Sequence, residues 1–226
     1  MLKRIFRRLP ISYYPYKPFM HTYNCIFIHI PKNAGSSVLR AFNDQGGRKH
    51  AKWHDFYAAN SYFFRRYHKF AIVREPAERL YSAYRYYLKG GNQSEEDLAL
   101  TQKISEHNSN FSGFVESILD TDFYMLQPLF QPQYLYVYDR RLICRVDRLL
   151  RYETLMQDWR DLARAQAFPE NLPWVNASQD KVESNNKPSL PALSEKAIKK
   201  INQLYKLDFE LLGYRPLSLP TDKQDS

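Results

Sequence analysis

The residues best suited to chemistry in this chain are a lysine, a glycine and two serines in the segment Pro31-Lys32-Asn33-Ala34-Gly35-Ser36-Ser37. An apolar run over residues 25–30 precedes the segment and predicts a buried strand, and apolar residues at helical spacing follow it. A small-residue turn between a strand and a helix suits a phosphate group, because Gly35 lets the main chain approach the anion and the first helical N–H groups point at it. The serine hydroxyls and the Lys32 ammonium would add donors and positive charge.

A second segment of this kind follows the next predicted strand, over residues 69–74. The strand ends at Arg74, and Pro76 suits the first position of a helix. Ser82 lies about two turns into that helix, so it and Arg74 could face one groove and offer a guanidinium fork and a hydroxyl to a second phosphate. Arg79 lies three residues before Ser82, on nearly the same helix face.

The first segment is not a Walker A loop, because its lysine precedes the glycine instead of following it. A cation at the front of the loop lies near the strand end, where a group in transfer and its bridging oxygen would be. A P-loop nucleotide-binding enzyme such as a kinase remains an alternative; it predicts Mg²⁺ dependence and a Gly-Lys-Ser/Thr ending, which is absent here. A nucleotide-binding module without catalysis is a second alternative.

Together the two segments resemble the sulfotransferase superfamily. Residues 31–37 look like its 5′-phosphosulfate loop and residues 74–84 like its 3′-phosphate motif, in the same order. The segment Arg151-Tyr152-Glu153-Thr154-Leu155 is similar to one in the carbohydrate (family 2 type) branch, and a bacterial relative is the closer comparison. The resemblance implies an α/β fold with a P-loop-like parallel sheet flanked by helices.

The resemblance also implies the reaction. A sulfuryl group would pass from 3′-phosphoadenosine 5′-phosphosulfate (PAPS) to a hydroxyl of a carbohydrate acceptor, which can be a glycan, a polysaccharide or a glycolipid, by in-line displacement and without a metal. Lys32 would be catalytic by stabilising charge on the bridging oxygen. The residues that the resemblance assigns to binding the donor are Lys32, Asn33, Ala34, Gly35, Ser36, Ser37, Arg74 and Ser82.

An alcohol acceptor needs a general base. In the resembled branch a Lys-His pair often follows the first helix, and Lys49-His50 stands in the matching place, so we predict His50 as the base. His54 and the glutamates Glu75 and Glu78 remain alternatives for this role.

The chain has 226 residues and a net charge of +9, from 33 basic and 24 acidic side chains. Five of the basic residues lie within the first 20, which contain no acid, so the remaining chain is only mildly basic. We therefore expect a basic leader over residues 1–21, suited to an anionic membrane surface, a sulfotransferase domain over 22–216 and a tail over 217–226. A mildly basic domain argues against a nucleic-acid partner.

The two cysteines, Cys25 and Cys144, lie in apolar runs, and we expect two buried free thiols. Without a targeting or membrane-spanning segment, a cytoplasmic location is expected. For the remaining elements, the pattern predicts a helix over 35–44, one helix over 55–67 and helices over 76–89, 95–107 and 111–119. It also predicts strands over 134–138 and 148–152, a helix from 154 to 167 and a last helix from Ser194.

Overall fold

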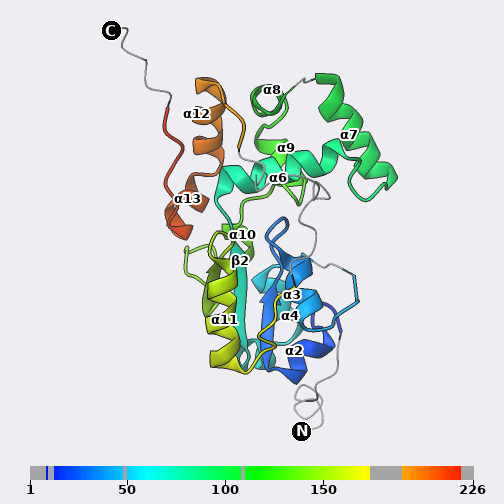
Figure 1. Ribbon diagram of the computed structural model, residues 1–226, viewed down its shortest axis with the longest axis vertical. Helices are drawn as coiled ribbons and strands as arrows, with labels where there is room; N and C mark the ends of the chain where they lie inside the picture. Colours follow the sequence, from blue (N-terminus) through cyan, green and yellow to red (C-terminus); the bar gives the residue numbers. More distant parts are fainter. Residues whose placement is uncertain (1–8, 10–12, 48–49, 108–109, 174–189, 220–226) are drawn as a thin grey trace. The chain divides into compact units, whose positions relative to one another are not determined.

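The computed structural model describes residues 9, 13–47, 50–107, 110–173 and 190–219, and Figure 1 shows its helices and strands. The chain divides into two compact units. One comprises Met1–Arg74 and Gln133–Asn185, and contains the sheet. The other comprises Glu75–Pro132 and Asn186–Ser226, and within the described residues it is helical. No described helix is both long enough and apolar enough to cross a membrane.

The sheet of the first unit has three described strands in the order β1-β2-β3: β1 (Cys25–Ile28), β2 (His68–Val73) and β3 (Arg148–Arg151). Both pairings are parallel, with Cys25 opposite His68 and Phe70 opposite Arg148. All four residues of β1 are buried, which explains why this strand is a continuous apolar run instead of an alternating one. The predicted parallel sheet is confirmed, and its strands end together at one edge.

Helices flank this sheet, as predicted. They are α2 (Pro18–Thr22), α3 (Gly35–Ala41), α4 (Trp53–Ala59), α5 (Ser61–Arg66), α10 (Tyr134–Val137) and α11 (Leu155–Gln166). α11 packs beside β3 and α2 beside β1 (Figure 1). Aromatic rings fill the space between them: Phe42 stacks on Phe19 at 4.5 Å and meets Trp159 and Phe168 edge-on.

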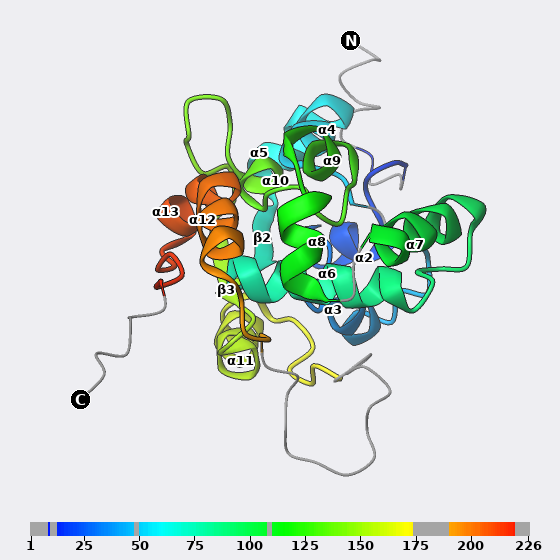
Figure 2. The same cartoon turned by 90° about the horizontal axis from the view of Figure 1, so that it is seen from above.

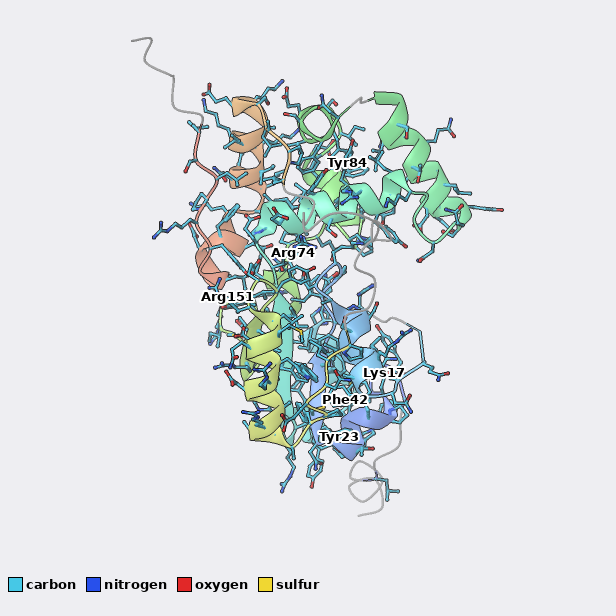
Figure 3. All side chains as sticks on the ribbon, in the orientation of Figure 1. Lys17, Tyr23, Phe42, Arg74, Tyr84 and Arg151 are labelled. Atoms are coloured by element: carbon cyan, nitrogen blue, oxygen red, sulfur yellow. The ribbon has the colours of Figure 1, made fainter. Side chains whose placement is uncertain are left out.

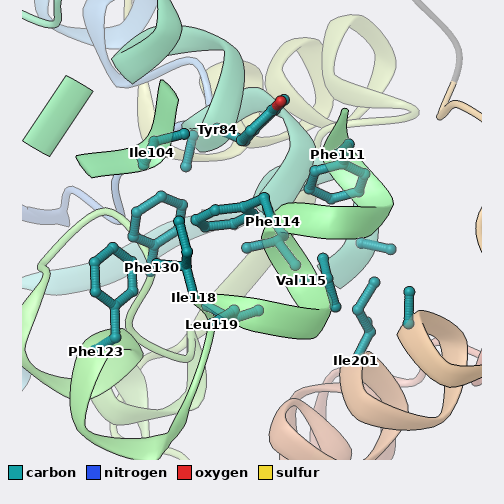
Figure 4. Close-up of a cluster of buried hydrophobic side chains, with 14 of the residues drawn as sticks. Tyr84, Ile104, Phe111, Phe114, Val115, Ile118, Leu119, Phe123, Phe130 and Ile201 are labelled. Atoms are coloured by element: carbon teal, nitrogen blue, oxygen red, sulfur yellow. The ribbon is translucent and has the colours of Figure 1, made fainter. Parts of the chain in front are cut away.

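The second unit consists of α6 (Pro76–Leu88), α7 (Glu95–His107), α8 (Phe111–Ser117), α9 (Thr121–Leu126), α12 (Glu195–Leu204) and α13 (Lys206–Leu212). Within this unit α8 lies between α12 and α7 (Figure 2). Its core is aromatic and aliphatic: the rings of Phe114 and Phe130 lie 5.4 Å apart, and Ile201 of α12 points toward Val115 of α8 (Figure 4). The unit therefore has a hydrophobic core of its own.

Two predicted elements are wrong in kind or extent. Residues 134–138 were expected as a strand but form the single helical turn α10, in which Tyr136 and Val137 are buried. A short apolar, aromatic run fits either structure, and tertiary packing decides between them. The single helix expected over 55–67 is two helices, because the Asn60 side chain accepts hydrogen bonds from the N–H groups of Tyr62 and Phe63 and caps α5.

Other expectations differ in detail. Cys25 is buried as expected, but Cys144 is exposed, in an antiparallel bridge with Tyr138 after α10. The helix α9 was not anticipated; the Asp120 side chain caps it by accepting the N–H of Phe123. The last helix begins after Ser194 as predicted, and it breaks at Tyr205 into α12 and α13.

Part of the predicted leader packs onto the sheet unit. Tyr16, Phe19 and Met20 are buried, and the Lys17 ammonium lies 2.7 Å from Asp44 and donates to the carbonyl of Gly46. The Lys17 ammonium is therefore paired with groups of the sheet unit. The leader's first eight residues and residues 10–12 lie outside the described part of the chain.

Candidate active site

The predicted anion-binding loop lies between β1 and α3, at the carboxyl end of the sheet. Lys32 and Ala34 both have left-handed main chains, with φ of 68° and 55°. Left-handed residues in a tight turn aim successive N–H groups toward one side, which forms a concave site for an anion. The first turn of α3 closes with the Ser37 N–H donating to the Ala34 carbonyl at 2.9 Å. The N–H groups of Gly35 and Ser36 lie at the start of the helix, where no earlier helical carbonyl can accept from them.

Burial divides the loop into two sets of side chains. Lys32, Ala34 and Ser36 are partly exposed, whereas Asn33, Gly35 and Ser37 are buried, with Asn33 and Ser37 each at 1%. The sequence could not separate these sets, because all six residues stand in one small-residue turn. Of the polar side chains in the loop, Lys32 and Ser36 are the ones that reach its surface.

Asn33 is tied to the neighbouring strand. Its side-chain amide donates to the carbonyl of Ile72 in β2 and to the side-chain oxygen of Gln133, each at 2.8 Å. Gln133 also accepts the main-chain N–H of Arg74 at 3.0 Å and donates to the Arg74 carbonyl at 2.7 Å. A buried glutamine therefore connects the loop after β1 with the residue that directly follows β2.

Gly35 is required by close packing instead of by its main-chain conformation. Its φ is not positive, but a Cβ at this position would lie 1.8 Å from Nε2 of His29. The His29 ring is buried, stacks on Phe27, and lies 4.6 Å from the ring of His50. His29 is thus a core residue, and its ring lies against Gly35 at the start of α3 and against the ring of His50.

His50 is held in one orientation by this arrangement. Its Nδ1 lies 3.1 Å from the carbonyl oxygen of His29. Because a carbonyl can only accept, Nδ1 carries the proton, and the neutral ring has its lone pair on Nε2. A histidine in this tautomer is suited to accept a proton at Nε2. His54, the alternative, is more exposed and lies 3.2 Å from Asp55.

Lys52 adds a cation to the same segment, while Lys49 lies outside the described residues. The Lys52 ammonium lies 5.4 Å from the centre of the Tyr136 ring. Burial lowers the pKa of Lys52 from its usual range, and the nearby Asp55 carboxylate opposes part of that shift.

Arg74 lies at the carboxyl end of β2, and its guanidinium stacks on the ring of Tyr152 at 4.4 Å. Tyr152 directly follows β3, and its N–H donates to the Val73 carbonyl at 2.8 Å. Figure 3 shows Arg74 and Arg151 at one end of the sheet and Tyr23, which precedes β1, at the other. Tyr152, directly after β3, therefore orients Arg74, directly after β2.

Ser82 and Arg79 lie on α6, in the helical unit. Ser82 is partly exposed. Arg79 is fully buried, and its guanidinium donates to the main-chain carbonyls of Leu129, Phe130 and Gln131. Its donors thus stabilise an irregular segment of its own unit. Glu75 and Glu78 belong to this unit as well: Glu75 caps α6 by accepting the N–H of Glu78.

Within the sheet unit, Gln133 links Asn33, which follows Lys32, to the main chain of Arg74, and His50 contacts the His29 carbonyl just after β1. The ring of Tyr152 stacks on the Arg74 guanidinium, and sequence reasoning assigned Gln133, Tyr152 and His29 no part in the site. One signal was available, since Tyr152 lies within the segment that resembles the carbohydrate branch. The predicted role of Ser82 stays a prediction, as do the roles of the loop residues.

Comparison with known families gives one result. A family model described as the sulfotransferase family matches residues 19–215, which is most of the chain. No curated protein and no solved structure matches the chain significantly.

Proposed function

Because the chain belongs to the sulfotransferase family, we propose that it transfers a sulfuryl group from PAPS to a hydroxyl of a carbohydrate acceptor. The observation that carries the proposal is the loop of residues 31–37. It combines left-handed turns at Lys32 and Ala34 with an outward lysine and serine at the end of a parallel strand. The family match favours this function over the kinase-like alternative.

In this proposal the main chain of the loop binds the 5′-phosphate of the donor. Lys32 stabilises the negative charge that develops on the bridging oxygen as the sulfur–oxygen bond to the phosphate breaks. Ser36 adds a hydroxyl donor on the same surface. Asn33 and Ser37, being buried, act by holding the loop's shape. α3 has only seven residues, so the local N–H groups and Lys32 contribute more than the helix dipole.

Arg74 binds the 3′-phosphate with its charged fork. The ring of Tyr152 supports this role, because a cation stacked on an aromatic face loses less freedom when it binds an anion.

His50 acts as the general base. Its Nε2 accepts the proton of the acceptor hydroxyl while the hydroxyl oxygen forms its bond to sulfur, and adenosine 3′,5′-bisphosphate leaves. The hydrogen bond from Nδ1 to the His29 carbonyl supports this assignment, because it fixes the tautomer that a base needs.

The experiment is transfer of radiolabelled sulfate from PAPS to a panel of glycans, polysaccharides and glycolipids, with alkyl and aryl alcohols as non-carbohydrate acceptors. We expect label on a carbohydrate and at least about a hundredfold loss of rate in Lys32→Ala, which removes the cation that stabilises negative charge on the bridging oxygen. Lys69→Ala is the matched control, since Lys69 pairs with Asp147 at the opposite end of β2.

Label on alcohols but on no carbohydrate would contradict the acceptor class. Donor binding without transfer to any acceptor would instead favour the module without catalysis. A Lys32→Ala rate equal to that of the wild-type chain would contradict the role of the loop.

A further inference from the structure

The buried side chain of Gln133 makes hydrogen bonds to both anion-binding segments of the sheet unit. It is fully buried, at 0% exposure. Its oxygen accepts from the Asn33 side chain, in the loop after β1, and from the Arg74 N–H, at the end of β2; its amide nitrogen donates to the Arg74 carbonyl. One side chain thus joins two loops that are 41 residues apart in sequence and lie at the same sheet edge, in addition to the direct bond from Asn33 to the Ile72 carbonyl of β2.

The orientation of this amide is fixed by its partners. Its oxygen faces two donors and its nitrogen faces a carbonyl, so a flipped amide would set donor against donor and oxygen against oxygen. The same holds for Asn33, whose amide nitrogen faces the Ile72 carbonyl and the Gln133 oxygen. Few other side chains could replace Gln133, because the position needs an acceptor for two donors and a donor for one carbonyl.

We propose that Gln133 is a positioning residue that sets the spacing between the 5′-phosphate loop and the 3′-phosphate arginine. This inference rests on the proposed function for its ligand. The proposed donor carries phosphates at both its 5′ and 3′ positions and engages both sites at once. Freeing either loop therefore weakens binding of a molecule with two phosphates more than binding of a molecule with one. Gln133 touches neither phosphate itself; it acts through Asn33 and Arg74.

The position of Gln133 in the chain supports the same role. The chain leaves the sheet unit after Arg74 and re-enters it at Gln133. The two hydrogen bonds between Gln133 and the main chain of Arg74 therefore hold the outgoing and incoming segments side by side. Without them, β2 would keep its strand pairings up to Val73 and the Arg74 guanidinium its stacking on Tyr152, but the main chain of Arg74 would lose both hydrogen bonds to Gln133.

The test compares Gln133→Met, which keeps the length of the side chain and removes its polar atoms, with Gln131→Met. Gln131 belongs to the helical unit, where its side chain donates to the Met125 carbonyl, so it is a matched control. We expect Gln133→Met to bind adenosine 3′,5′-bisphosphate at least about tenfold more weakly, equal to about 1.4 kcal/mol, while adenosine 5′-monophosphate loses less. Gln131→Met should match the wild-type chain for both nucleotides.

A second variant uses pH. In Gln133→Glu the ionised carboxylate still accepts from both donors but sets an oxygen against the Arg74 carbonyl, whereas the protonated acid can donate to it. Its affinity for the bisphosphate relative to wild type should therefore rise as the pH falls from about 8 to about 5. A flat ratio over this range would overturn the donor role of Gln133.

Hydrogen exchange tests the inference without a ligand. The Arg74 amide donates to Gln133, so its exchange should become at least about tenfold faster in Gln133→Met, and exchange in residues 32–36 should also rise, with no such change in Gln131→Met. Unchanged exchange and unchanged bisphosphate affinity would overturn the inference. If the wild-type chain binds no bisphosphate at all, the proposed function fails, and the exchange data still decide the role of Gln133.

Discussion

Replacing Gly35 with alanine tests the contact that links the anion-binding loop to the proposed base. The added Cβ would lie 1.8 Å from Nε2, 2.0 Å from Cδ2 and 2.5 Å from Cε1 of the His29 ring. An ordinary contact begins near 3.4 Å, so the ring or the start of α3 must move by about 1.6 Å. The His29 ring is buried between Phe27 and His50, and it therefore has little room to move.

Overpacking a core usually costs about 1–3 kcal/mol, and this overlap is severe, so we expect Gly35→Ala to lower the free energy of unfolding by about 3 kcal/mol. Gly47→Ala is the matched control. A Cβ there meets nothing within 4 Å, and its φ is not positive, so the change should lie within about 1 kcal/mol of zero. Urea unfolding followed by tryptophan fluorescence measures both values.

A double variant isolates the cause. In a His29→Ala background the ring is gone, and Gly35→Ala should cost at least about 1.5 kcal/mol less than in the wild-type chain. Equal costs in the two backgrounds, or a Gly35→Ala variant as stable as Gly47→Ala, would refute the reasoning. Sulfuryl transfer by Gly35→Ala should also fall, because the His29 ring and carbonyl position His50.

Further predictions concern the side chains around the site. Arg74→Ala should weaken binding of adenosine 3′,5′-bisphosphate by at least about tenfold in calorimetry, and Tyr152→Leu by about three- to tenfold, since only the stacking is lost. An effect of Tyr152→Leu that persists in an Arg74→Ala background would show that the tyrosine acts elsewhere. His50→Ala should lower kcat by about a hundredfold and His54→Ala by less than about twofold; the reverse order would move the base to His54. Asn60→Ala, which removes the cap of α5, should lower the free energy of unfolding by about 1 kcal/mol, and a melting curve like that of the wild-type chain would argue against the cap.

Much of the sheet unit was predictable because its signals are local. The buried runs in β1 and in the second half of β2 are continuous and apolar. β1 ends at Ile28, shortly before Pro31, and β2 ends at Val73, directly before Arg74. The start of α6 at Pro76 follows from the fixed φ of proline. These features depend on neighbours in sequence, and the structure has them within one or two residues of the predicted bounds.

The failures have tertiary causes. The run of residues 134–138 has the composition of a strand, but residues 134–137 form the helical turn α10, with Tyr136 and Val137 packed in the interior. Arg79 was expected beside Ser82 on one face, yet its guanidinium is buried against the carbonyls of residues 129–131, some 50 residues away in sequence. A local sequence pattern cannot indicate hydrogen-bond partners that lie so far away along the chain.

The candidate site was predictable as a set of residue types but not as a geometry. The two sequence motifs identified Lys32 and Arg74. The burial of Asn33 in the loop accompanies a hydrogen bond to the Ile72 carbonyl of β2, a partner that the sequence does not indicate. The role of His29 as the support of His50 likewise depends on the packing of its ring against Gly35.

The central claim is that one nucleotide with phosphates at both its 5′ and 3′ positions is the natural ligand of the loop and of Arg74. Calorimetric titration of the full chain with adenosine 3′,5′-bisphosphate and with adenosine 5′-monophosphate tests it directly. The proposal predicts that the bisphosphate binds at least about tenfold more tightly, through the charge-assisted contacts of the added phosphate. Equal affinity for the two nucleotides, or binding of neither, would contradict it.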